Sequence, residues 1–171
     1  MAETKTAGAV IGETIVVEET GVGLFQAEVR AGAATFLVDE PVSAGGMGSG
    51  PNPFDLLSAA LGSCTSMTVR LYARQKNWPL TNVRVSVTHH RPDLHARDLF
   101  EKEISFEGAL DDAQKARLIA IAERCPVHLT LTRGADVTTT LAPDARASEK
   151  PNDLCEHMTN MEEACRQAEV S

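Results

Sequence analysis

The 171-residue sequence predicts one α+β domain followed by a polar C-terminal extension. Segments rich in Val and Thr lie on both sides of one long apolar helical segment. Strands, helix, strands, helix and strand therefore follow one another, an order that favours antiparallel sheets over alternating β-α units. Because aromatic residues make up only 4 %, the core must be built mainly from Leu, Val, Ile and Ala.

The N-terminal part of the chain predicts three short strands in two successive hairpins. They cover residues 13–18, 24–30 and 34–39, and glycines separate them. The glycine-rich loop at 43–50 lacks both the dinucleotide-binding spacing and the phosphate-loop lysine. We interpret this loop as a flexible connection.

Residues 53–76 carry the strongest helix signal. Asn52 is a favourable N-cap, Pro53 suits the first helical position, and Asp55 can reach back to the cap as in a capping box. Apolar or small side chains recur at three- and four-residue steps and predict one buried face. That face contains Leu57, Ala60, Leu61, Cys64, Met67, Thr68 and Leu71.

The second half of the domain predicts a hairpin and then helices. Residues 81–91 and 99–107 alternate apolar and polar side chains as paired strands do, and 111–124 has helical periodicity. We expect a short helix at 126–133 and a final strand at 136–142. The valines predicted to face inward in the first strand of the hairpin are Val83, Val85 and Val87.

The composition changes at Pro143, which divides the chain into a domain of residues 1–142 and a polar extension of residues 143–171. The extension contains a thin apolar stripe at helical spacing, which predicts a short helix that docks on the domain or on a partner. A frayed polar terminus is the alternative. The stripe consists of Cys155, Met158, Met161 and Cys165.

Charge and composition exclude several classes of function. The net charge of −8 would repel a nucleic acid, and no apolar run is long enough to span a membrane. The N-terminus lacks the pattern of a secretory signal, and the chain is large enough to fold without disulfides. We therefore expect a cytoplasmic protein that needs neither a metal nor another cofactor, because no ligand spacing recurs among its histidines.

Two cysteines are considered as candidate reactive thiols, and the local sequence around each suggests a different role. Cys64 lies in the middle of the long helix, where a thiol is often an inert part of the core. Cys125 precedes Pro126 and would be the N-cap of the short helix, where backbone N–H groups favour a thiolate. The alternative is that Cys125 and Pro126 only end the preceding helix.

Four segments together resemble the OsmC/Ohr family, and more closely its OsmC-like branch. They are DEP at 39–41, GGMGSGPNP at 45–53, DLLSAALGSCTSMTVRLYARQKNWPL at 55–80 and AERCPVHLTL at 122–131. The resemblance covers about residues 13–142 and implies an intertwined homodimer, with antiparallel sheets around a long central helix that carries a cysteine.

The resemblance also implies a function, that of a thiol peroxidase which reduces organic hydroperoxides. By the family pattern, Cys64 corresponds to the peroxidatic cysteine and Cys125 to the resolving cysteine. Cys64 would become a sulfenic acid, a disulfide with Cys125 would follow, and an external dithiol would restore both thiols. The alternative, on the same fold, is a non-catalytic redox sensor or a module that binds a small apolar ligand.

The charged residues of the family site correspond less directly to residues of this chain than the two cysteines do. The family uses an arginine from the N-terminal strands, for which Arg30 is our candidate. In the Ohr branch a glutamate follows the proline at the helix start, but here Phe54 follows Pro53 and the acid is Asp55. Asp55 is therefore a candidate for the site, with capping of the helix as the alternative.

Overall fold

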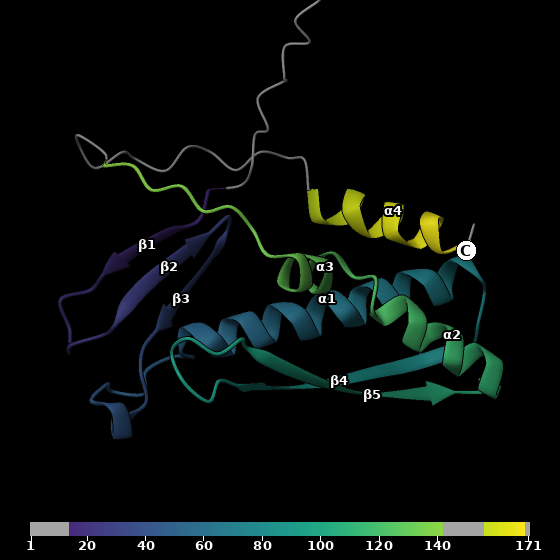
Figure 1. Cartoon of the computed structure of the whole chain (residues 1–171), viewed down its shortest axis with the longest axis horizontal. Helices are drawn as coiled ribbons and strands as arrows, with labels where there is room; N and C mark the ends of the chain where they lie inside the picture. Colours follow the sequence, from purple (N-terminus) through teal and green to yellow (C-terminus); the bar gives the residue numbers. More distant parts are fainter. Residues whose placement is uncertain (1–13, 142–155, 170–171) are drawn as a thin grey trace, which may run out of the picture.

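A computed structural model describes residues 14–141 and 156–169 of the chain. These residues form two antiparallel sheets and four α-helices, which confirms the predicted α+β class (Figure 1). The two sheets are separate, and the longest helix begins beside the first sheet and runs along the second. None of the helices in these ranges is long and apolar enough to cross a membrane.

The N-terminal sheet consists of β1 (Val16–Glu19), β2 (Ala27–Ala31) and β3 (Ala34–Val38), each antiparallel to the next. The two predicted hairpins are therefore confirmed, although the first two strands begin later than expected. Gly21 and Gly23 have positive φ angles, and the turn that they form extends through Phe25.

The glycine-rich loop after β3 is folded around a carboxylate, and a short 3₁₀ helix, η1 (Val42–Ala44), lies within it. Buried Asp39 accepts hydrogen bonds from the backbone N–H groups of Glu40, Met47 and Ser49 and from the Ser49 hydroxyl. A side chain at Gly46 would collide with the Glu40 carbonyl. The interpretation as a flexible connection is therefore wrong, because hydrogen bonds to Asp39 fix the loop.

Helix α1 (Pro53–Gln75) is the central element. The predicted capping box is present, since Asn52 accepts from the Asp55 N–H at 3.0 Å and donates its own N–H to the Asp55 carboxylate at 3.0 Å. The predicted apolar face is buried at Leu61, Cys64 and Thr68. The prediction is wrong at Leu57 and Met67, whose side chains are exposed in this chain. The buried face of α1 includes Thr65, Val69 and Tyr72 instead.

The second sheet is the long hairpin of β4 (Leu80–His90) and β5 (Leu99–Gly108), on which α1 packs. Half-buried and exposed residues alternate along both strands, and the valines at 83, 85 and 87 are among the half-buried ones, as predicted. Helices α2 (Asp112–Ala122) and α3 (Pro126–Arg133) follow β5 and also contact α1.

Helix α4 (Glu156–Glu169) lies along α1 on the side opposite the hairpin, as Figure 1 shows in yellow. Its buried residues are Met161, Ala164, Cys165 and Ala168. Two of these, Cys165 and Ala168, belong to the main core together with Val69, Tyr72 and Leu118. Of the predicted stripe, Met161 and Cys165 are buried, Met158 is exposed, and Cys155 lies outside the described residues.

The predicted final strand at 136–142 is wrong for the residues that the structure describes. Residues 135–141 form no ladder and are exposed, with Val137 at 87 % and Leu141 at 97 %. The segment has strand-forming residues, but a strand also needs a neighbour to pair with.

Candidate thiol site

Cys64 and Cys125 meet in the core although 60 residues separate them in the chain. Cys64 lies in the middle of α1, and Cys125 is the N-cap of α3. Their thiols are in hydrogen-bond contact, and both residues are almost fully buried. Both remain free thiols in this structure.

The first turn of α3 donates a hydrogen bond to each sulfur. The Val127 N–H donates to Cys64 Sγ at 3.4 Å, and the His128 N–H donates to Cys125 Sγ at 3.3 Å. The predicted N-cap role of Cys125 is therefore confirmed. Because the positive end of a helix dipole faces both sulfurs, a negative charge on the pair is stabilised there.

Two further polar groups lie close to the Cys125 side of the pair. The Thr65 hydroxyl is 3.4 Å from Cys125 Sγ, and Lys102 Nζ, from β5, lies 3.4 Å from the same hydroxyl. Lys102 also donates to the Ala122 carbonyl at 3.0 Å and lies 3.4 Å from His128 Nδ1. A half-buried ammonium group is thus held beside the thiols.

These contacts place the negative charge of the resting pair on Cys125. The hydrogen bond from Cys64 is the largest cause that lowers the pKa of Cys125, to about 5, and Thr65, the His128 N–H and Lys102 act in the same direction against burial. The same bond and burial raise the pKa of the Cys64 thiol far above its ordinary value. Burial in turn lowers the pKa of Lys102, while the charge on Cys125 opposes that change.

A third group reaches Cys64 from the C-terminal helix. His157 Nε2, in the first turn of α4, lies 3.2 Å from Cys64 Sγ. The proton of Cys64 therefore has two acceptors within reach, the sulfur of Cys125 and the imidazole of His157.

A cavity of about 230 Å³ opens beside the cysteine cluster. Leu61, Phe100 and Leu131 form its apolar wall and also pack around the two thiols. Arg97, Asp98, Lys102, His128 and Thr132 supply polar or charged groups to the same cavity. A small molecule with an apolar part and polar atoms matches this mixed lining.

The structure does not bring Arg30 to the cysteines within one chain. Arg30 lies on β2, and its guanidinium pairs with Glu18 and Glu28 of the same sheet, each at 2.7 Å. No residue of that sheet belongs to the cluster around the thiols. In the described residues of a single chain, Lys102 rather than Arg30 is the cation beside the thiols, and Arg97 is a second cation at the cavity.

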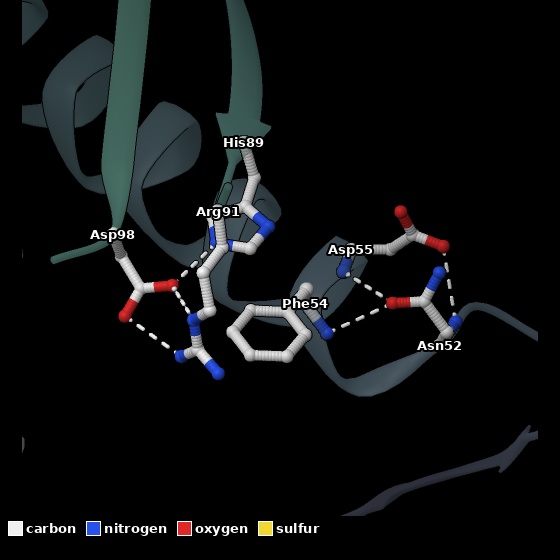
Figure 2. A network of polar contacts seen from close by, with 6 residues as sticks. All are labelled: Asn52, Phe54, Asp55, His89, Arg91 and Asp98. Carbon is white, nitrogen blue, oxygen red and sulfur yellow. Dashed lines mark hydrogen bonds and ion pairs between the residues drawn. The ribbon is translucent and has the colours of Figure 1, made fainter. Parts of the chain in front are cut away.

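Asp55 caps α1, and its neighbour Phe54 joins a separate network (Figure 2). The Phe54 ring stacks on His89 with centroids 4.3 Å apart, and the Arg91 guanidinium lies 4.9 Å from its centre. Asp98 binds His89 Nε2 at 2.7 Å and Arg91 Nε at 2.8 Å. This network attaches the end of the hairpin to the start of α1.

Lys102, Thr65 and His157 are absent from the candidates that sequence reasoning produced. A signal for Lys102 was available, because it occupies an inward position of β5 between Phe100 and Ile104, where a charge needs a partner. No local pattern marks His157, which is 93 residues from Cys64 in the chain.

A chain with this arrangement belongs to a known family. The family model described as OsmC-like protein matches residues 46–140, more than half of the sequence, and the chain belongs to that family. The matched range includes both cysteines and ends before α4. No curated protein sequence matches the chain significantly.

Solved structures share the fold at low sequence identity. One is a putative osmotic stress induced and detoxification response protein from Psychrobacter arcticus, with 24 % identity, a TM-score of 0.62, and coverage of 71 % of this chain and 90 % of that one. An OsmC-like protein from Mycoplasma pneumoniae has 18 % identity and a TM-score of 0.62, with 72 % and 89 % covered. An organic hydroperoxide resistance protein OsmC from Legionella pneumophila has 21 % identity and a TM-score of 0.52, with 72 % and 90 % covered.

Proposed function

We propose that the protein is a thiol peroxidase that reduces organic hydroperoxides, with Cys64 as the peroxidatic cysteine and Cys125 as the resolving cysteine. The observation that carries this proposal is the contact of two free thiols at a helix N-terminus beside a lysine. Family membership supports it, and a structural relative from Legionella is described as an organic hydroperoxide resistance protein.

The reaction begins when the Cys64 sulfur, as a thiolate, attacks the terminal oxygen of the hydroperoxide. An S–O bond forms, the O–O bond breaks, and the alkoxide leaves as an alcohol after it takes one proton. The peroxide is reduced by two electrons, and Cys64 is oxidised to a sulfenic acid. The N–H of Val127 and the charge of Lys102 stabilise the sulfur anion before the attack.

Cys125 then attacks the Cys64 sulfenic sulfur as a thiolate. A disulfide forms, and the hydroxyl group leaves as water after it takes one proton. Since the two thiols already touch, little movement of α1 or α3 is needed. An external dithiol reduces the disulfide by two exchange steps and is itself oxidised to a disulfide. Such a cycle fits a reducing compartment such as the cytoplasm.

The cavity beside the thiols supports an organic substrate over hydrogen peroxide. Leu61, Phe100 and Leu131 line this cavity and also pack around the two thiols, so they can bury the apolar part of a hydroperoxide close to the sulfurs. Hydrogen peroxide has no apolar part and gains nothing from this wall. The proposed substrate class is therefore a small or medium alkyl or aryl hydroperoxide.

We also propose that two chains form a homodimer and that Arg30 or Asp55 can contribute to a site only across that interface. The support is a set of large apolar side chains that this chain leaves exposed on its first sheet and on α1, among them Val17, Phe36 and Met67. We retain residues 1–142 as the OsmC-like domain and residues 143–171 as its extension.

Rapid mixing of the reduced protein with cumene hydroperoxide or hydrogen peroxide, followed by mass mapping of disulfides, tests the proposal. The expected result is faster consumption of the organic peroxide and a bond between Cys64 and Cys125. Cys64→Ser should abolish consumption, whereas Cys125→Ser should react once and then over-oxidise. Slow oxidation of every thiol without selectivity would instead favour the redox-sensing or ligand-binding module.

A further inference from the structure

The reaction proposed above needs a charge at Cys64, whereas the reduced pair by itself holds the charge at Cys125. Cys125 Sγ accepts from the His128 N–H and contacts the Thr65 hydroxyl, whereas Cys64 Sγ accepts from the Val127 N–H and is also affected by the Thr68 hydroxyl. Cys64 therefore donates its proton to Cys125 in the resting contact. A nucleophile at Cys64 requires a second group that takes this proton.

We propose that His157 is a further catalytic residue of this site and accepts the Cys64 proton, so that the Cys64 sulfur becomes the attacking anion. Its Nε2 is 3.2 Å from Cys64 Sγ, within the reach of a sulfur hydrogen bond. The tautomer with its proton on Nδ1 leaves a lone pair on Nε2 that points at the sulfur. This inference rests on the proposed peroxidase function.

The packing of α4 fixes the position of this imidazole. Met161, one turn after His157, is only 2 % exposed, and Cys165 one turn further lies against α1, with Sγ 3.9 Å from the Thr68 carbonyl. At its other end α4 is held by an ion pair of Glu169 with Lys76 and by a hydrogen bond from Arg117 to the Ala168 carbonyl. A helix held along its length positions the ring better than a loose terminus would.

The proton then has a complete path through the first step. His157 takes it from Cys64, the thiolate forms the S–O bond, and the imidazolium returns the proton to the alkoxide, which leaves as an alcohol. No further reactant is needed, and the ring ends neutral as it began. Because α4 lies beyond the residues 46–140 that match the family model, this base belongs to the extension of this chain.

Several titratable groups surround the pair and must be considered in any pH profile. Cys125 and His128 face it from α3, and Lys102 faces it from β5. Substitution of His157 leaves Cys125, His128 and Lys102 in place. A change in the pH dependence of the reactivity of Cys64 on that substitution therefore reports on His157.

Competitive alkylation of the reduced full-length protein with iodoacetamide, followed by mass mapping, tests the assignment without any peroxide. In the parent protein we expect measurable labelling of Cys64 at neutral pH beside that of Cys125, which holds the charge of the resting pair. In His157→Gln the Cys64 rate should fall by about 10²-fold relative to Cys125 and recover only at higher pH. The matched control is His95→Gln, since His95 is an exposed turn residue outside the site, and it should behave as the parent does.

An unchanged labelling ratio and pH profile in His157→Gln would overturn the assignment. Since that change could also loosen α4, His157→Gly with added imidazole is the second variant. Recovery of Cys64 labelling by imidazole supports a role as base, and no recovery overturns it. If the parent protein fails to reduce hydroperoxides but the ratio still depends on His157, the proposed function fails and the role of His157 stands.

Discussion

The docking of α4 depends strongly on one buried methionine, which makes it accessible to a quantitative experiment. Met161 is 2 % exposed and is the largest buried side chain of that helix. Burial of a side chain of this size stabilises by about 1.5–3 kcal/mol. We expect Met161→Ala to remove about 2 kcal/mol of this, which raises the undocked population of α4 roughly 30-fold at 1.4 kcal/mol for each factor of ten.

Native-state hydrogen exchange measures that population directly. The amides of 156–169 should exchange roughly 30-fold faster in Met161→Ala, while the paired amides of β4 and β5 keep their rates. Met158→Ala is the matched control, because it removes the same side chain one turn earlier on the same helix at a position 42 % exposed. It should leave the exchange rates within about twofold of the parent.

Equal effects of the two substitutions would refute this reasoning. An unchanged exchange rate over 156–169 in Met161→Ala would also refute it, because the burial of Met161 would then contribute nothing to docking. Faster exchange everywhere in the chain would show instead that α4 and the hairpin unfold as one unit.

Three other predictions follow from the charges and the exposed surfaces. Lys102→Met should raise the pKa of Cys125 above about 5, because the charge of the lysine lowers that pKa. The ultraviolet absorbance of the thiolate during a pH titration measures the change. Lys115→Met, on the exposed side of α2, is the control. Hydrogen bonds from Arg91 and then His89 lower the pKa of Asp98 to about 2. The contribution of this carboxylate to the free energy of unfolding is therefore complete above its ordinary pKa of 3.8 and is lost as the pH falls through about 2. Asp98→Asn should therefore lower the urea midpoint at neutral pH and have a diminishing effect below pH 3.8, and an equal effect at both would contradict the charge argument. Sedimentation of the purified protein should show a dimer, and a monomer at every concentration would contradict the proposed interface.

The parts of the fold that depend on local chemistry could be predicted from the sequence. Asn52, Pro53 and Asp55 specify the start of α1 through their own hydrogen bonds and backbone angles, and the capping box is present as expected. Pro126 similarly locates the start of α3 and makes Cys125 its N-cap. These features require no knowledge of distant parts of the chain.

The parts that depend on distant contacts could not be predicted in the same way. Residues 136–142 have the composition of a strand, but the structure provides no pairing partner for residues 136–141. The helical spacing of Met161 and Cys165 indicated a stripe that could dock, whereas its docking site on α1 and the approach of His157 to Cys64 follow only from the tertiary fold.

The position of Lys102 has a consequence for the oxidised half of the proposed cycle. In the reduced protein its ammonium group is half-buried and faces a pair of sulfurs that together carry one negative charge. Formation of the disulfide removes that charge, so that Glu123 is the negative charge that still acts on the half-buried lysine. The surroundings of the sulfurs are therefore more positive in the oxidised protein than in the reduced one, and an incoming thiolate reductant is attracted more strongly when the disulfide is present to be reduced.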